Sequence, residues 1–313
     1  MFDNIHLRLE RFAVGEEVFS SIASRLSNCK EVIDRETGEA RSYGSLGGLK
    51  VTVYESSLYI VGSLAKFYNG SNIYTLNRKD TERAVQKLSE ALGADISTAK
   101  VSYLEFGDAF LMENPVEEYL KRLGSLPRLH RNPQQGSLYY QYQGEQRKSL
   151  VFYDKKLEMK KRKDPLPDGF QNYNILRFEL RFKNRLPKQI GWYETVTAST
   201  LYDRQFYKRM QSLYRENYFA ISKRKMMKPT ALKEVCNPKD AFSCLTGLLL
   251  SRADTETVAD FMSQLAMANV LDRQQLYRFR QMVERAKAKG KHLEEDTLIM
   301  ELDNQIINAC LYC

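Results

Sequence analysis

Regular alternation of charged and apolar residues marks the segment Ile175–Lys183, ILRFELRFK. Successive side chains of a strand point to opposite faces, so the charged residues of this segment would share one face. They are Arg177, Glu179, Arg181 and Lys183. One carboxylate among three cations can hold a metal ion or a phosphate group. A half-exposed amphipathic strand without a ligand explains the alternation equally well.

A second chemical group is Tyr153, near the end of the predicted strand Lys148–Asp154. A tyrosine hydroxyl can attack a phosphodiester and hold the phosphate as a covalent phosphotyrosine. Lys155 and Lys156 follow directly, and they could lower the pKa of Tyr153 or stabilise the charge on a phosphorane. The chain has 19 tyrosines, so the residue type alone is weak evidence for catalysis.

A second carboxylate comes from the predicted strand Lys100–Phe110, KVSYLEFGDAF. Its alternation places Tyr103, Glu105 and Gly107 on one face. If this strand neighbours the strand of Glu179, the two glutamates lie on the same polar face. Mg²⁺ binds carboxylate oxygens and keeps several water ligands. The pattern favours a metal site at Glu105 and Glu179, although either glutamate alone is more often a solvated residue.

The positive charge of the chain is concentrated in one segment. The net charge is +9, but residues 147–228 hold 21 Lys and Arg against eight Asp and Glu, so the remainder is net acidic. The densest run is Lys155–Lys163, and tyrosines are interleaved with the basic segment. Basic side chains neutralise phosphates and aromatic rings stack on unpaired bases, so we expect nucleic acid as the partner. A solvated helix face or a localisation run explains a basic cluster alone.

Several functions are excluded by the absence of their motifs. The chain has no GxxxxGK[ST] phosphate loop, which makes an internal ATPase unexpected. Its three histidines, His6, His130 and His292, are scattered and form no metal-binding pair. No apolar run reaches the roughly 18–20 residues of a membrane span, and the first residues do not form a secretory signal. We therefore expect a cytoplasmic protein with no membrane partner.

The hydrophobic pattern predicts an α+β fold: an antiparallel-sheet catalytic domain with flanking helices over residues 1–195, followed by an all-α region over 196–313. The predicted strands are Phe2–Phe12, Leu49–Tyr54, Ser57–Ser63, Lys100–Phe110, Ser137–Gln143, Lys148–Asp154 and Ile175–Lys183. The predicted helices are Glu16–Leu26, Asp80–Leu92, Pro115–Leu123, Asp240–Arg252, Glu256–Asn269, Arg273–Lys289 and Glu295–Leu311. A hairpin around Gly144 would join two of the strands. In the helical region, Phe261, Leu265, Val270 and Leu271 are expected to be mostly core.

Four blocks of the sequence resemble the rolling-circle replication initiators of phages, plasmids and mobilisable elements, which include the filamentous-phage nicking protein. They are Gly62–Asn72 (GSLAKFYNGSN), Leu104–Gly107 (LEFG), Leu150–Glu158 (LVFYDKKLE) and Leu176–Lys183 (LRFELRFK). Weaker matches at Thr197–Asp203 and Tyr218–Lys223 extend the resemblance over about half of the chain. One departure is Glu105, where the family commonly has Asp, and the longer side chain shifts the position of any metal.

The resemblance implies a nicking and religating enzyme. Tyr153 would become joined to a 5′-phosphate at a replication origin, assisted by Lys155 or Lys156, and the free 3′-OH would prime synthesis. Glu105 and Glu179 would hold Mg²⁺ or Mn²⁺, and the origin would be read as a hairpin or single strand. A host DNA helicase would be a further partner, docked in part on the helical region, and a homodimer is possible. The residues expected to contact DNA are Lys66, Lys160, Lys161, Arg162, Lys163, Arg177, Arg181 and Lys183.

Three other interpretations compete with this one. A non-catalytic DNA-binding control protein of a plasmid or phage explains the basic segment, but not the three motifs around Tyr153, Glu105 and Glu179. A conjugative relaxase-like nickase would carry a histidine cluster, which the chain lacks. A structural protein with an incidental basic face would not bind DNA at physiological salt.

Overall fold

The protein is represented by a computed structural model that describes residues 1–33, 38–142, 147–224, 236–250, 255–268, 270–290 and 297–311. The chain divides into two compact units, Met1–Ser222 with Glu301–Cys313, and Lys223–Met300. The division differs from the predicted boundary at residue 195, because helix α7 (Arg204–Phe219) packs on the sheet and belongs to the first unit. None of the described helices is long and apolar enough to cross a membrane.

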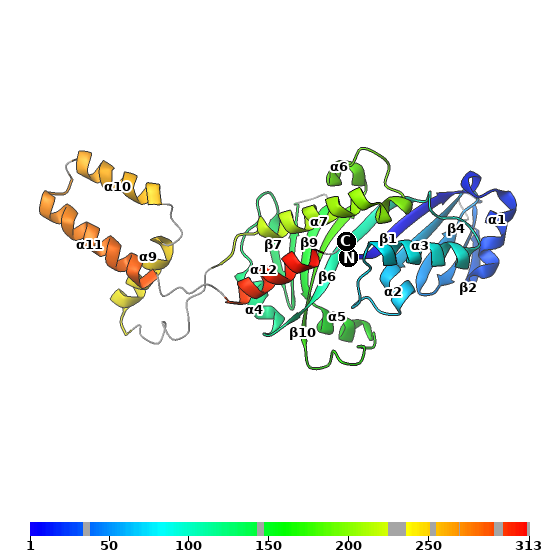
Figure 1. Ribbon diagram of the computed structural model, residues 1–313, viewed down its shortest axis with the longest axis horizontal. Helices are drawn as coiled ribbons and strands as arrows, with labels where there is room; N and C mark the ends of the chain where they lie inside the picture. Colours follow the sequence, from blue (N-terminus) through cyan, green and yellow to red (C-terminus); the bar gives the residue numbers. More distant parts are fainter. Residues whose placement is uncertain are drawn as a thin grey trace. The chain divides into compact units, whose positions relative to one another are not determined.

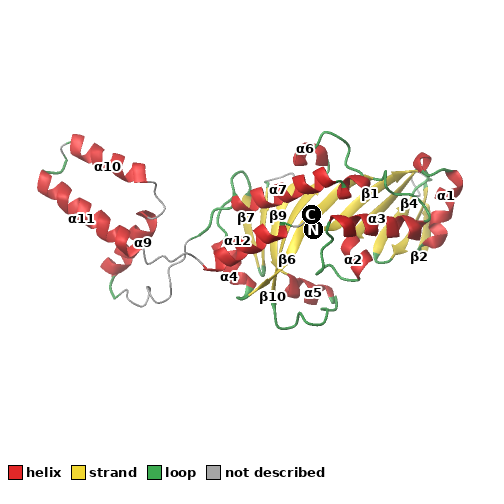
Figure 2. Ribbon diagram, in the orientation of Figure 1, coloured by secondary structure: helices red, strands yellow, loops and turns green. Residues whose placement is uncertain are grey.

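A ten-stranded sheet is built by the described residues of the first unit (Figure 2). Its order is β2-β3-β4-β5-β1-β6-β10-β9-β8-β7, and all neighbours are antiparallel. The strands are β1 Phe2–Glu10, β2 Ser27–Ile33, β3 Ala40–Leu46, β4 Leu49–Val53, β5 Ser57–Ser63, β6 Lys100–Met112, β7 His130–Gln134, β8 Ser137–Gln141, β9 Lys148–Asp154 and β10 Asn174–Lys183. The predicted α+β class with an antiparallel sheet is confirmed.

Helices flank this sheet (Figure 1). They are α1 Glu16–Ser21, α2 Leu64–Asn69, α3 Arg78–Leu92, α4 Val116–Arg122, α5 Lys155–Arg162, α6 Leu186–Ile190, α7 and α12 Thr297–Ala309. Short 3₁₀ turns are η1 Arg11–Ala13, η2 Ile22–Arg25 and η3 Ser199–Tyr202. The predicted helix Glu16–Leu26 is thus split into α1 and η2. Gly144, the predicted centre of a hairpin, lies outside the described residues, although β8 and β9 pair as expected.

One face of the sheet is aromatic and lies under α7. Phe178 of β10 stacks on Phe152 of β9 with ring centroids 4.1 Å apart, and it contacts Tyr214 of α7 at 4.4 Å. Phe106 of β6 meets the same Tyr214 edge-on at 5.9 Å. All four rings are fully buried. Because buried aromatic rings supply large apolar areas, this face is the main core of the unit.

The opposite face of the sheet is polar and only partly covered. At one end, Ile73, Met159 and Ile175 form a small buried cluster, against which Leu166 and Phe170 pack. This cluster joins α5 and the loop after it to the segment that follows α2. The polar residues of β6 and β10 lie beside it, and the site described below is built from them.

The first unit is completed by α12, close to the end of the chain. Tyr218 of α7 donates a hydrogen bond of 2.6 Å to Asp303, and Tyr119 of α4 donates one to Glu301. Leu302 and Ile306 are fully buried. Residues 223–300 are therefore an insertion between two helices, α7 and α12, that both belong to the sheet-containing unit.

The described part of the second unit contains α9 Pro238–Leu250, α10 Thr255–Met267 and α11 Arg273–Gly290. Phe261 and Phe279 meet edge-on at 6.3 Å beside an apolar hollow of about 720 Å³. Phe261 is 53% exposed and Val270 67% exposed, while Leu265 and Leu271 are half-buried. The expectation that these residues are mostly core was wrong, because three short helices leave much of their apolar surface uncovered.

Candidate active site

The register of β6 and β10 brings the two predicted glutamates together. Arg181 is paired with Glu105, and Glu179 is paired with Gly107. A Cβ atom on Gly107 would lie 2.2 Å from the carbonyl oxygen of Phe178 and 2.8 Å from Cα of Glu179. Only glycine therefore permits this close approach of the two strands.

Arg177 holds the centre of the site. Its Nε donates to Oε1 of Glu179 at 3.0 Å, its Nη2 to Oδ2 of Asp3 at 2.9 Å, and its Nη1 to the carbonyl of Asn72 at 3.0 Å. The side chain is fully buried. Arg181 adds two hydrogen bonds to Oε2 of Glu179, at 2.7 and 3.1 Å. The two guanidinium groups hold the pKa of Glu179 at about 2, against the effect of its burial.

A third carboxylate, Asp3, was missed by the sequence analysis. Ser63 and Asn72 both donate to Asp3, the latter at 2.9 Å. The first resemblance block, Gly62–Asn72, therefore fixes this acid. Ser63 also caps α2 by accepting from the backbone N–H of Lys66. The alternation of β1 could not reveal Asp3, because the pairing of β1 with β6 shifts between Phe2 and Ile5.

These three acids form a group that could hold a cation. Asp3, Glu105 and Glu179 are buried, and each offers an oxygen within 4.8 Å of the others. Burial and the charge of Glu179 raise the pKa of Glu105 to about 7. The side-chain oxygen of Asn72 is buried and has no hydrogen-bond partner among the described residues. A divalent cation would relieve both features, and an all-oxygen set suits Mg²⁺ or Mn²⁺, so the residues fit the predicted metal.

Tyr153 lies directly beside this cluster. It is paired with Arg177 across β9 and β10, and its hydroxyl donates to Oε1 of Glu179 at 2.8 Å. The lysines were expected to lower its pKa, but burial and the charge of Glu179 raise the pKa well above the ordinary value. Tyr153 is therefore a neutral hydrogen-bond donor in this state.

The two candidate lysines have different surroundings. Lys155 is fully buried, its Nζ lies 5.8 Å from the ring centroid of Tyr153, and it bonds Glu158 at 2.8 Å. Burial lowers the pKa of Lys155. Lys156 instead donates to the carbonyl of Gln171 at 2.5 Å. Of the two, Lys155 is the one beside the tyrosine.

A groove of about 430 Å³ gives access to Tyr153. It runs between the turn from β7 to β8, strand β9 and helix α5. Arg181, whose side chain is 28% exposed, lies at the groove together with Lys161 and Arg162. A phosphate group that entered the groove would thus meet Tyr153 and three cations.

The residues predicted to contact DNA do not share one environment. Lys160, Lys161, Arg162, Lys163 and Lys183 are exposed. Lys66 bonds Asp164 at 2.6 Å and links α2 to the loop after α5. Arg177 is 0% exposed, so the expected contact of this residue with DNA is wrong for this conformation: its guanidinium organises the acids instead. No sequence signal separates it from Arg181, because both occupy the polar side of β10.

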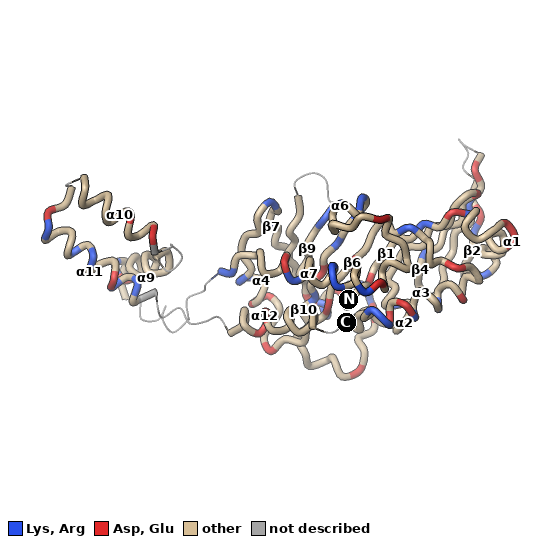
Figure 3. The backbone as a smooth tube through the Cα atoms, turned by 45° about the horizontal axis from the view of Figure 1, so that its top comes forward, with Lys and Arg blue, Asp and Glu red and all other residues tan. Residues whose placement is uncertain are grey.

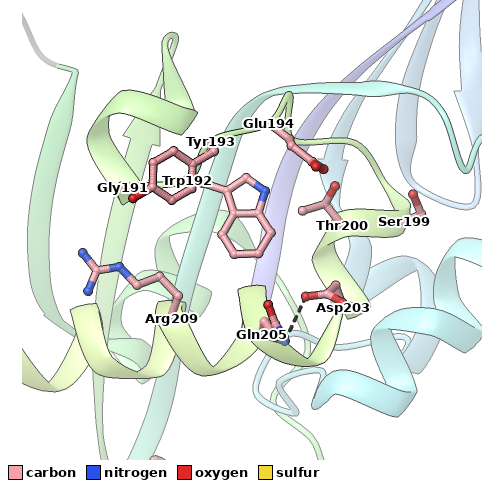
Figure 4. A pocket seen from close by; sticks show the side chains of 9 residues that line it. All are labelled: Gly191, Trp192, Tyr193, Glu194, Ser199, Thr200, Asp203, Gln205 and Arg209. Carbon is pink, nitrogen blue, oxygen red and sulfur yellow. Dashed lines mark hydrogen bonds between the residues drawn. The ribbon is translucent and has the colours of Figure 1, made fainter.

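A second hollow of about 690 Å³ lies between the loop after α6 and the start of α7 (Figure 4). Trp192 and Tyr193 line it together with Arg209 of α7. It shares no lining residue with the groove at Tyr153. The hollow is therefore separate from the candidate active site.

Comparisons with known proteins agree with the motifs. The family profile Phage_CRI, described as the N-terminal part of the replication-associated protein, matches residues 1–210. No curated protein matches the chain. A solved rolling-circle replication initiator from Geobacillus stearothermophilus has a TM-score of 0.39 at 11% identity and covers 77% of this chain and 89% of its own. The di-domain ARO/CYC protein StfQ of the steffimycin biosynthetic pathway has a TM-score of 0.20 at 8% identity, with coverages of 69% and 94%. Structural likeness at these TM-scores carries no argument about function. Because the family profile covers more than half of the 313 residues, the chain belongs to the phage replication-associated proteins, the rolling-circle initiators that its motifs resemble.

Proposed function

We propose that this initiator nicks and rejoins one DNA strand at a replication origin through a covalent bond between Tyr153 and a 5′-phosphate. The observation that carries the proposal is the hydrogen bond from Tyr153 to Glu179, in a groove that also contains Arg181. A nucleophile, an acceptor for its proton and a cation for the phosphate thus lie together. The motifs at these positions and the family membership support the same chemistry.

In the nicking step, the bond between the tyrosine oxygen and phosphorus forms while the bond between phosphorus and the 3′ oxygen breaks. The tyrosine loses its proton and the 3′ oxygen gains one, so the step is balanced. Glu179 accepts the hydrogen bond of Tyr153, and the arginines keep Glu179 ionised for that role. Arg181 would stabilise charge on the phosphate oxygens. Rejoining is the reverse reaction, and it needs no ATP because the phosphotyrosine conserves the bond energy.

Asp3, Glu105 and Glu179 would hold Mg²⁺ or Mn²⁺ in this proposal. When bound, such a cation supplies Lewis-acid polarisation of a phosphate oxygen. Arg177 keeps two of these acids in position, and Asn72 holds the third-block carboxylate Asp3 from the opposite side. The exposed cations Lys160, Lys161, Arg162, Lys163 and Lys183 would contact the DNA, together with Arg181.

The test is an assay for a protein-linked nick. The protein is incubated with Mg²⁺ and a supercoiled plasmid that carries its own gene and flanks, and covalent DNA is detected on a denaturing gel. We expect the adduct with the native protein and none with Tyr153→Phe, which should bind the DNA normally. Tyr139→Phe is the matched control, because Tyr139 lines the same groove. An adduct formed by Tyr153→Phe would remove Tyr153 from the role, and binding without any nick would favour the non-catalytic alternative.

We also propose that a host helicase docks on the inserted helical unit, since the sequence has no phosphate loop for ATP hydrolysis. A variant that ends near Pro229 would lose α12 and its contacts with α7, so it is a poor test. Replacing residues 225–296 by a Gly/Ser linker retains α12. This variant should nick normally but should not support unwinding by added helicase and ATP. Unwinding equal to that of the native chain would contradict the docking role, and a homodimer would be visible in the mass measured for either protein.

A further inference from the structure

The polar face of the sheet continues from the active site toward its far edge. Beyond the row of Arg181 and Glu105, β10 and β6 pair Lys183 with Tyr103. Tyr103 is paired with His6 of β1, and their rings lie 4.5 Å apart. Directly paired residues share a face of the sheet. His6 is therefore on the same face as the active-site glutamates.

Register carries this face on across β1, β5, β4, β3 and β2. From His6 the row continues through Val61 to Lys50. The neighbouring row consists of Arg8, Tyr59, Thr52, Tyr43 and Lys30, one from each successive strand. We call the polar face of strands β2–β5 and Arg8 the wing face. It is joined to the active site without a change of side.

Burial separates the two sides of these strands. On the side away from the wing face, Leu7, Val51 and Ile60 are at most 1% exposed. On the wing face, Lys30, Arg41 and Lys50 are exposed and Tyr43 is 40% exposed. Figure 3 shows basic positions along the strands at this end of the sheet. The wing is thus a sheet with one face in the core and one face open to solvent.

The open side is basic and aromatic. Lys30, Arg41 and Lys50 line a hollow of about 540 Å³ together with Tyr43 and Tyr54. Arg8 lies over the ring of Tyr59, 5.5 Å from its centroid, and is also paired with Glu10 at 2.8 Å. None of the residues that line the hollow is acidic. Positive charge with accessible rings suits a flexible anionic chain that carries flat groups.

We propose that the wing face binds single-stranded DNA that leaves the active site along the sheet. Phosphates would contact Lys30, Arg41 and Lys50, and an unpaired base would stack on Tyr43. Duplex DNA would satisfy the cations but would not present the face of a base to a tyrosine. The continuity with Tyr153 rests on the proposed function, whereas DNA binding by the wing face does not.

The dimensions agree with a strand of this kind. Six strand spacings separate β9, which carries Tyr153, from β3, which carries Tyr43. At ~4.8 Å per spacing this is about 29 Å. Known single-strand grooves accommodate ~4–16 nucleotides, so a short segment next to the nick would fill the wing face.

The test measures binding without chemistry. All proteins carry Tyr153→Phe, and the probe is a fluorescent oligothymidylate of about 12 nucleotides, within the usual range of such sites. Fluorescence anisotropy is recorded over a series of salt concentrations without divalent cations. Changing Lys30, Arg41 and Lys50 to Gln should weaken binding and reduce the slope of log K against log salt by up to ~2, at ~0.7 for each lost phosphate contact.

The matched control changes Lys79, Arg83 and Lys208 to Gln. These residues are exposed on α3 and α7, which lie over the opposite face (Figure 1). The control has the same loss of charge and should leave the slope within ~0.7 of the native value, less than one phosphate contact. Equal slopes for the two triple variants would mean that only net charge matters, and they would overturn the proposal.

Tyr43 tests the stacking part separately. Tyr43→Ala should weaken oligothymidylate binding by roughly 5- to 100-fold, the range of a lost base–aromatic stack, and Tyr43→Phe should bind like the native residue. Neither change should alter binding of a duplex of the same length. Unchanged binding of the single strand by Tyr43→Ala would overturn the assignment of single-stranded DNA. Because no nick is measured, failure of the wing face and failure of the nicking proposal are distinguishable.

Discussion

The two sides of β10 do different work, although they come from the same ten residues. Even-numbered positions such as Phe178 and Leu180 are fully buried under α7 and build the core. Odd-numbered positions such as Arg177 and Glu179 are equally buried but are ionised and mutually bonded. Burial alone therefore does not separate core from site in this strand. What separates them is that every buried charge has a partner, as the cost of desolvation requires.

The difference teaches where the protein tolerates change. An aromatic side chain can lose a methylene at moderate cost, since its contacts are many and weak. A member of the network of Asp3, Arg177 and Glu179 cannot be removed without leaving another charge unpaired. We expect substitutions on the aromatic face to change stability alone. Substitutions on the polar face should change stability and nicking together, except at its exposed margins.

The largest effect is expected for Glu179→Gln. Nicking should fall by orders of magnitude, because the acceptor for Tyr153 loses its charge. The free energy of unfolding should also fall by about 3–5 kcal/mol, because Arg177 and Arg181 are left partly unpaired. Glu105→Gln is the comparison: it should reduce metal-dependent nicking but destabilise less, since only Arg181 among the cations contacts Glu105. Urea unfolding and plasmid nicking measure the two quantities. Normal nicking by both variants would contradict the carboxylate site.

On the aromatic face, Phe178→Ala should lower the free energy of unfolding by about 3–5 kcal/mol. The side chain is fully buried between Phe152 and Tyr214. The rate of nicking per folded molecule should stay near the native value, because no atom of Phe178 enters the groove. Phe178→Leu is the control and should cost less. A loss of nicking in a folded Phe178→Ala protein would break the division between the two faces.

A pH dependence should distinguish Glu105 within the polar face. Its pKa is about 7 in the folded protein, above the ordinary 4.5. Between these values the folded state holds a proton that the unfolded state has released, so stability falls as pH rises. The slope from this group is at most ~1.4 kcal/mol per pH unit. Thermal unfolding of the native protein and Glu105→Gln across this interval measures it. Identical pH profiles would show that Glu105 keeps an ordinary pKa.

The smallest effect is expected at the exposed end of α5. Changing Lys160, Lys161, Arg162 and Lys163 to Gln should leave stability nearly unchanged, since these side chains are exposed. Binding of single-stranded DNA should weaken for all sequences, and the salt slope should fall by up to ~0.7 for each lost phosphate contact. Salt titration of binding measures this slope. An unchanged slope would assign the four residues to solvation of the loop.

Strict alternation made part of this site predictable. It placed Glu105 and Glu179 on the polar sides of their strands and Tyr153 near the end of β9, and the structure brings all three together. Alternation does not say what covers a face, so the burial of Arg177 could not be foreseen. Asp3 was missed because β1 changes register beside it. Strand β2 was missed because all of its residues are exposed and no burial pattern distinguishes it from a loop.

The return of α12 to the first unit has a consequence for the order in which the protein is made. The sheet can form early in synthesis, since its last strand, β10, ends at Lys183. Tyr218 and Tyr119 wait for Asp303 and Glu301 until the whole insertion has left the ribosome. Domains generally fold as they emerge, starting from the N-terminal side. A nascent chain halted within the insertion would therefore carry the complete polar face on a sheet that lacks its last covering helix.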